Sequence, residues 1–183
     1  MINALGEWVL STACEEAARW SSPLKVSVNV SPIQLINCSL TEVIVNVLQK
    51  TGLDPHRLDL EITESDVFNE NTRSLEILSQ LRELGIQISI DDFGTGYSSL
   101  SRLSYFPFDK IKIDRSFVIN IPQQKDDLDI VRLIISMGKS LHMCIVAEGV
   151  ETEEQLQSLQ QLGCDLVQGY LIGKPGPLNT PLK

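Results

Sequence analysis

The chain has 183 residues, of which 43% are hydrophobic and 21% charged, and its 15 basic and 24 acidic side chains give a net charge of -9. This length and composition suit a globular domain and exclude a disordered or fibrous chain. The acidic balance argues against broad binding to DNA, RNA or anionic lipid, and every apolar run is shorter than the roughly 18 residues of a membrane span. The four cysteines are scattered without a CxxC pair, so we expect a reduced, cytoplasmic protein.

Apolar periodicity predicts helices and strands that alternate along the chain. The sequence opens with a helix, because Ile2, Leu5 and Val9 begin an apolar stripe that continues to Trp20. Strand-like runs follow at 26–30, 58–62, 87–91, 110–114, 144–148 and 166–170. Helical stretches are expected from 40 up to Gly52 and around 71–84, 98–105, 127–141 and 153–162. The last of these begins with a capping box of Thr152 and Gln155 and ends at Gly163.

This alternation predicts an α/β fold with parallel strands joined by crossover helices. The strand starts advance by about 28 residues on average, so the eight units of a barrel need more residues than the chain has. In the first four runs one face is aliphatic and the other polar, which favours a barrel with a polar interior over an open sheet covered on both faces. We therefore expect a TIM-like (β/α)8 barrel that is incomplete and lacks one or more opening strands.

Ligand-type side chains occur near the C-terminal end of every strand-like run. They are Asn29, Glu61, Asp91, Lys112, Glu148 and Gln168. Barrel enzymes place their reacting groups at these strand ends. Each residue alone could simply cap the following helix, but six together favour a functional site. Carboxylate and amide oxygens without cysteine or histidine indicate Mg²⁺ or Mn²⁺ as the metal.

The dipeptide Asp91-Asp92 is the most informative part of this set. Two adjacent carboxylates repel one another unless cations lie between them, and a carboxylate that bridges two metal ions is typical of phosphoester hydrolysis. The alternative is that Asp92 faces solvent or caps the next helix. The glycine-containing segment 93–99 follows directly and permits a mobile or tightly turned loop over a site.

Two further strand-end residues suggest proton transfer and charge neutralisation. Lys112 could position a water molecule or neutralise a phosphate; the alternative is a salt bridge with Asp59 or Asp114. Glu148 is a candidate general base or further metal ligand, and Glu151 follows one turn later.

Six short motifs run along the chain in a distinctive order. They are NVSP (29–32), EITES (61–65), DDFGTGYSSL (91–100), KIDRSFV (112–118), VAEGVET (146–152) and GCDLVQGYLIGKP (163–175). In order and spacing, from about residue 5 to residue 177, they resemble the EAL-domain family, the bacterial phosphodiesterases of cyclic di-GMP. The resemblance implies a single EAL-type domain over residues 1–183, with an EAL-type barrel.

The resemblance also implies roles for individual residues. Asn29, Glu61 and Asp91 would bind one Mg²⁺ or Mn²⁺, and Asp91 with Asp92 would serve a second ion. The catalytic residues would be Lys112, which holds the attacking water, and Glu148, which acts as general base or second-metal ligand.

Further implied roles concern the substrate and the loop at 92–98. The implied substrate-binding residues are Asp114, Arg115 and Gln168. Glu64 and Glu151 would support the loop.

The implied activity is hydrolysis of cyclic di-GMP to linear pGpG. The Glu-Ala-Leu segment that names the family would precede Asn29 by more residues than this sequence contains. We therefore expect a domain truncated at its N-terminus, and also at its C-terminus, whose first metal site lacks one ligand and whose activity is weak or absent. The alternative is a non-catalytic signalling module that binds cyclic di-GMP or a protein partner. We also expect a homodimer, and sensory or diguanylate cyclase domains attached in the full-length protein.

Overall fold

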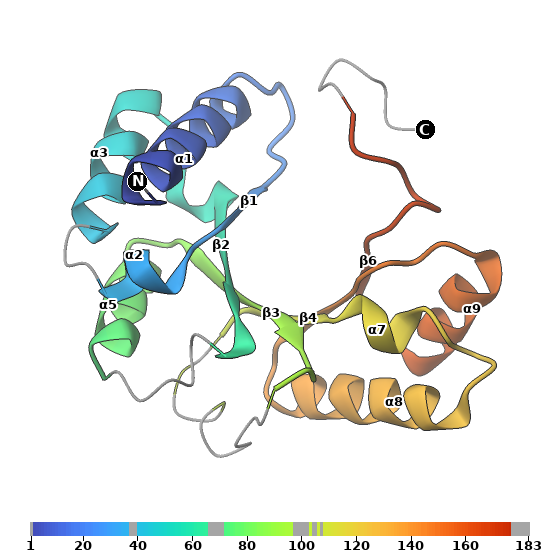
Figure 1. Cartoon of the computed structure of the whole chain (residues 1–183). Helices are drawn as coiled ribbons and strands as arrows, with labels where there is room; N and C mark the ends of the chain where they lie inside the picture. Colours follow the sequence, from blue (N-terminus) through green and yellow to red (C-terminus); the bar gives the residue numbers. More distant parts are fainter. Residues whose placement is uncertain are drawn as a thin grey trace. The chain divides into compact units, whose positions relative to one another are not determined.

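The computed structural model describes residues 2–36, 40–65, 72–96, 103, 106 and 108–176 (Figure 1). Its strands follow one another in the sheet in chain order, β1-β2-β3-β4-β5-β6. Pairing is parallel between β1 and β2, between β4 and β5, and between β5 and β6. Parallel neighbours require crossover connections, and helices occupy the intervening chain. The α/β class with parallel strands is therefore confirmed.

The chain folds as two compact units, each with its own set of helices and strands. The first comprises residues 1–90 and 98–108, and the second comprises 91–97 and 109–183. Strand β3 contributes residues to both units.

The first unit contains the elements from α1 to the beginning of β3. They are α1 (Ile2–Ala18), β1 (Val26–Asn29), α2 (Pro32–Ile36), α3 (Leu40–Thr51), η1 (Pro55–Arg57), β2 (Leu58–Thr63), α5 (Thr72–Glu83) and β3 (Gln87–Phe93). Alternate side chains of β2 and β3 supply its core, since Leu58, Leu60, Ile62, Ile88 and Ile90 are fully buried.

The apolar stripe predicted for α1 is buried only in its later part. Ile2, Leu5 and Val9 are between 38% and 54% exposed, whereas Ala17 of the same stripe is fully buried, as is Cys14 beside it. The helix carries apolar residues on more than one side, so periodicity alone could not identify the side that packs against the rest of the unit.

The second unit contains the end of β3 and the later elements. These are β4 (Lys110–Ile113), α7 (Arg115–Val118), α8 (Lys125–Ser140), β5 (Cys144–Ala147), α9 (Glu153–Leu162) and β6 (Leu166–Val167). The predicted capping box is present: the Thr152 hydroxyl accepts a hydrogen bond from the Gln155 amide, and the Gln155 side chain accepts one from Thr152 N–H. Helix α9 ends at Gly163, as expected, with φ of 77°.

Several strand boundaries differ from the predicted ones. Strand β3 continues to Phe93, two residues beyond the predicted end at Asp91. Strands β5 and β6 end at Ala147 and Val167, so Glu148 and Gln168 are the first residues of the loops that follow. The helix expected at 98–105 lies outside the described residues except for Leu103.

The described cysteines behave as packing residues. Cys14 is buried, Cys144 and Cys164 are half-buried, and all three are free thiols. Burial raises the pKa of Cys14 and of Cys164 to about 11, so both thiols stay protonated and unreactive at neutral pH. Cys38 lies outside the described residues. In the described part of the chain, every helix is too short or too polar to cross a membrane.

Candidate functional site

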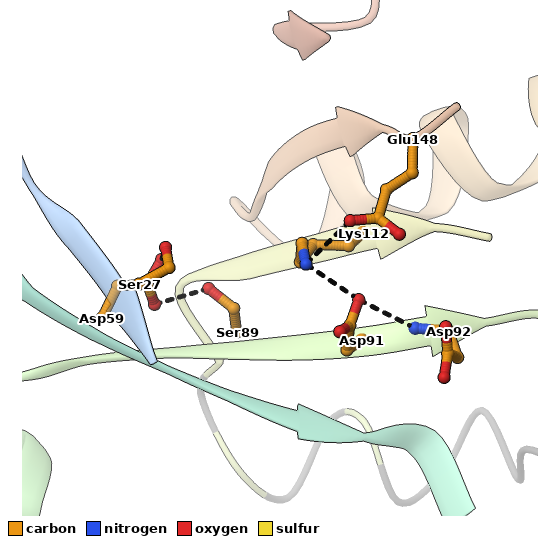
Figure 2. Close-up of polar contacts among 7 residues, drawn as sticks. All are labelled: Ser27, Asp59, Ser89, Asp91, Asp92, Lys112 and Glu148. Carbon is orange, nitrogen blue, oxygen red and sulfur yellow. Dashed lines mark hydrogen bonds and ion pairs between the residues drawn. The ribbon is translucent and has the colours of Figure 1, made fainter. Parts of the chain in front are cut away.

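Lys112 on β4 forms ion pairs with one carboxylate from β3 and one from the loop that follows β5. Its Nζ lies 3.0 Å from Asp91 Oδ1 on β3 and 2.7 Å from Oε1 of Glu148, the first residue after β5 (Figure 2). Only 6% of the lysine side chain is exposed. The chain-order arrangement of the strands thus brings together three residues that are far apart in the sequence. The predicted alternative for Lys112, a salt bridge with Asp59 or Asp114, stays a prediction beside these ion pairs.

Three carboxylates gather around this lysine. Oxygen atoms of Asp91, Asp92 and Glu148 all lie within 4.8 Å of one another. Three negative charges at this spacing repel strongly, and one ammonium group offsets only one of them. Clustered carboxylate oxygens are the donors that hard divalent cations prefer. The residues present therefore fit the Mg²⁺ or Mn²⁺ that the sequence predicted.

Asp92 adopts an unusual backbone conformation at this point of β3. Its φ is +53°, in the left-handed region that side chains other than glycine, asparagine and aspartate rarely enter. Its N–H donates to Asp91 Oδ1 at 3.1 Å, and its carbonyl accepts from Thr95 Oγ1 at 2.8 Å. These bonds hold Asp92 in a conformation that its backbone alone disfavours. The resulting turn keeps two consecutive carboxylates in one cluster, although successive strand residues normally point to opposite faces.

The electrostatic surroundings of Asp92 are unfavourable for its negative charge. Burial raises the pKa of Asp92 above its ordinary value, the carboxylates of Asp91 and Asp114 raise it further, and Lys112 lowers it. The charge on Asp92 therefore lowers the stability of the folded protein when no cation is bound.

Replacing Asp92 with Asn is expected to raise the melting temperature of the metal-free protein at pH 7 by about 1–2 °C. Asparagine tolerates positive φ and removes the repelled charge. Because folding raises the pKa of Asp92, the charge penalty is present at neutral pH and disappears as pH falls through that raised value, so the gain in melting temperature should shrink as the solution is made acidic. Thermal melts with a chelator test this, with Asp129→Asn on the exposed surface of α8 as the control. A lower melting temperature at pH 7 would contradict it.

The loop after β5 and the loop after β6 are joined by backbone hydrogen bonds. Gln168 N–H donates to the Ala147 carbonyl at 2.8 Å, and Val150 N–H donates to the Gln168 carbonyl at 3.0 Å. A Cβ on Gly169 would collide with the backbone of Val150, so glycine is required for this close approach. The backbone of Gln168 is therefore held beside the segment that carries Glu148.

The predicted substrate-binding residues Asp114 and Arg115 lie where β4 leads into α7. Asp114 is the N-cap of α7, and its carboxylate accepts from Ser116 N–H at 3.0 Å, so it does the capping that strand-end polar residues often do. Arg115 Nη2 lies 2.8 Å from Glu151 Oε1. The substrate roles stay predictions. The loop-supporting role of Glu151 also stays a prediction, because residues 97–98 lie outside the described part.

Asn29 and Glu61 belong to the first unit, where they are register partners near the C-terminal ends of β1 and β2. This confirms that parallel pairing brings the two predicted ligands side by side. Glu61 is 9% exposed. Glu64, which follows β2, is buried. Their roles in metal binding and loop support stay predictions.

A buried polar network in the same unit was missed by the sequence analysis. Asp59, only 1% exposed, accepts hydrogen bonds from Ser89 Oγ at 2.6 Å and from Ser27 Oγ at 3.2 Å (Figure 2). Ser27, Asp59 and Ser89 each precede a predicted ligand by two residues on the same strand. That spacing places them on the same strand faces as the ligands. The two-residue spacing is the sequence signal from which the network could have been predicted.

Comparison with known proteins identifies the family to which this arrangement belongs. A model of the EAL domain matches residues 1–175. The chain belongs to the EAL domain family. The predicted fold, an incomplete TIM-like (β/α)8 barrel of the EAL type, is confirmed by solved EAL domains. The phosphodiesterase of Pseudomonas aeruginosa MucR in complex with cyclic di-GMP matches with a TM-score of 0.93 and 43% identity, over 97% of this chain and 73% of that one.

Curated relatives of this EAL domain include signalling proteins and named phosphodiesterases. An uncharacterized signaling protein of Caulobacter vibrioides is 53% identical over 98% of this chain and 22% of its own length. The bifunctional diguanylate cyclase/cyclic di-GMP phosphodiesterase MucR is 43% identical over 97% of this chain and 26% of its own length. The chain thus spans about a quarter of the length of these relatives.

A solved structure in complex with a metal ion is also similar. Klebsiella pneumoniae BlrP1 with manganese and cyclic di-GMP matches with a TM-score of 0.88 and 32% identity, over 94% of this chain and 44% of that one.

Proposed function

We propose that this EAL domain hydrolyses one phosphodiester bond of cyclic di-GMP, giving linear pGpG, in a reaction that depends on Mg²⁺ or Mn²⁺. The observation that carries the proposal is the buried Lys112 held between Asp91 and Glu148, with Asp92 in the same carboxylate cluster. Support also comes from the relatives MucR and NbdA of Pseudomonas aeruginosa, which are named as cyclic di-GMP phosphodiesterases.

The carboxylates of Asp91 and Asp92 would hold the metal, and Asn29 and Glu61 remain predicted ligands. A bound divalent ion polarises phosphoryl oxygens and makes water a stronger nucleophile. Its positive charge also offsets the repulsion within the cluster.

The chain's own residues supply positioning and proton transfer. Lys112 is buried and fixed by two ion pairs, so its ammonium group is preorganised to orient the attacking water and to offset negative charge that develops on the phosphate. Glu148 is the proton acceptor for that water. Arg115 and Gln168 would contact the substrate.

The direct test is to incubate the protein with cyclic di-GMP and Mn²⁺ and to separate the nucleotides by chromatography. We expect pGpG to accumulate slowly, in keeping with the weak activity expected from the sequence, and its formation to stop when a chelator removes the metal. Binding of cyclic di-GMP without cleavage would contradict the proposal and favour the alternative function, a non-catalytic signalling module.

Metal binding can be tested independently of hydrolysis. At a concentration of about 100 times its dissociation constant, Mn²⁺ is expected to raise the melting temperature by about 5–10 °C, and Asp91→Ala should abolish this gain because it removes a central ligand. Asp129→Ala, which removes an exposed carboxylate on α8, should leave the gain unchanged. An equal rise in melting temperature with Mn²⁺ in Asp91→Ala would contradict the assignment of Asp91 as a metal ligand.

We further propose that the domain works in a larger signalling protein. MucR, a relative, is named as both a diguanylate cyclase and a phosphodiesterase, which supports attached cyclase or sensory domains. A single EAL-type domain over residues 1–183, a homodimeric assembly and a cytoplasmic location remain predictions.

A further inference from the structure

Arg115 is held by contacts from the loop after β5. Its Nη2 pairs with Glu151 Oε1 at 2.8 Å. Its aliphatic stem crosses Gly149, where an added Cβ would collide with the arginine side chain and where φ is +70°. Gly149 directly follows Glu148. The arginine is thus fixed against the segment that carries the proposed proton acceptor.

The side chain of Gln155 joins the loop after β5 to the end of α7. It is 4% exposed, and its Oε1 accepts from Glu151 N–H at 2.7 Å and from Thr152 N–H at 3.0 Å. Its Nε2 donates to the carbonyl of Ile119, the C-cap of α7, at 3.1 Å. Because Arg115 begins α7, Gln155 ties the arginine's helix to the backbone of its ion-pair partner.

The guanidinium of Arg115 keeps donors available. The side chain is 53% exposed, and within the described part of the chain its hydrogen bonding is accounted for by Glu151. An arginine carries five N–H donors in a planar fork that matches phosphate oxygens. One edge of the group can therefore stay on Glu151 while other donors face a phosphate.

We propose that Glu151 and Gln155 are positioning residues that hold the Arg115 guanidinium in place for a phosphate of the substrate. The proposal rests on the proposed function and adds two residues to it. Glu151 orients the charged group directly. Gln155 fixes the backbone of Glu151 relative to α7. Neither residue touches the reacting atoms.

A double-mutant cycle with cyclic di-GMP tests this on the Mn²⁺-loaded protein. Arg115→Ala is expected to raise KM about tenfold or more, because charge-assisted hydrogen bonds are lost. Glu151→Gln is expected to raise KM about threefold, the scale of an exposed ion pair, with kcat nearly unchanged. In the Arg115→Ala background, Glu151→Gln should have no further effect. Glu153→Gln, a neighbouring exposed glutamate, is the matched control. An equal effect of Glu151→Gln in both backgrounds would overturn the proposal.

A measurement without substrate separates this proposal from the proposed function. In ¹⁵N NMR spectra of the arginine side chains, the Arg115 guanidinium should rotate more slowly than an exposed arginine such as Arg19, and Glu151→Gln should abolish that difference. Gln155→Leu should also speed the rotation; if that variant fails to fold, Glu151→Gln alone decides. Restricted rotation without any hydrolysis would support the positioning and contradict the phosphodiesterase activity. Hydrolysis with unrestricted rotation in the wild type would contradict the positioning alone.

Discussion

Replacing Glu148 with Gln is expected to lower the rate of cyclic di-GMP hydrolysis at least ~100-fold, the scale of a lost proton-transfer group. Glutamine keeps the size of the side chain and can still accept a hydrogen bond from Lys112, which lies 2.7 Å from the glutamate. It cannot accept a proton from water near neutral pH. The loss should therefore appear in kcat, and KM should change little.

The control for this prediction is Glu154→Gln, which makes the same change of charge on an exposed glutamate of α9. Circular dichroism should show that both variants melt within a few degrees of the wild type. Hydrolysis by Glu148→Gln at more than a tenth of the wild-type rate would exclude Glu148 as the proton acceptor.

Replacing Lys112 with Met is expected to destabilise the metal-free protein by about 3 kcal/mol, because removing one partner of a buried ion pair leaves uncompensated charge. Here the lysine serves two half-buried carboxylates, Asp91 and Glu148. Hydrolysis should also be lost, because the variant has no buried ammonium group to orient water or offset phosphate charge.

Metal ions should change the stability of this variant in a specific way. Mn²⁺ should recover more stability in Lys112→Met than in the wild type, since the cation replaces the missing positive charge, but it should not restore hydrolysis. Urea unfolding with and without Mn²⁺ measures the stability of each protein and its gain from the metal, with Lys139→Met, which changes an exposed lysine of α8, as the control. The same gain from Mn²⁺ in both proteins would show that the lysine and the metal do not share these carboxylates.

Much of the site could be predicted from the sequence because it depends on strand order. Parallel strands in chain order end at the same edge of a sheet, so Asp91, Lys112 and Glu148 could be expected to meet once each strand was located. Asn29 and Glu61 could be paired for the same reason. These inferences need only the alternation of aliphatic and polar residues, which is a local pattern.

Features set by individual contacts could not be predicted in this way. The left-handed backbone of Asp92 goes with a hydrogen bond from Thr95 in its own turn, and the ion pair of Arg115 with Glu151 joins residues 36 positions apart. No periodic pattern encodes either one. The partial burial of the stripe predicted for α1 has a related reason, because several faces of that helix are apolar and only its packing partners select the one that is buried.

The lack of space at Gly169 has a consequence for how variants of this protein are interpreted. Any larger residue there must push apart two loops, one of which begins with Glu148 and the other with Gln168. In a saturation mutagenesis screen scored by phenotype, position 169 should therefore rank with the carboxylates in intolerance to change. Such a ranking would place this glycine among the catalytic residues, although it carries no reacting group and matters only because it has no side chain.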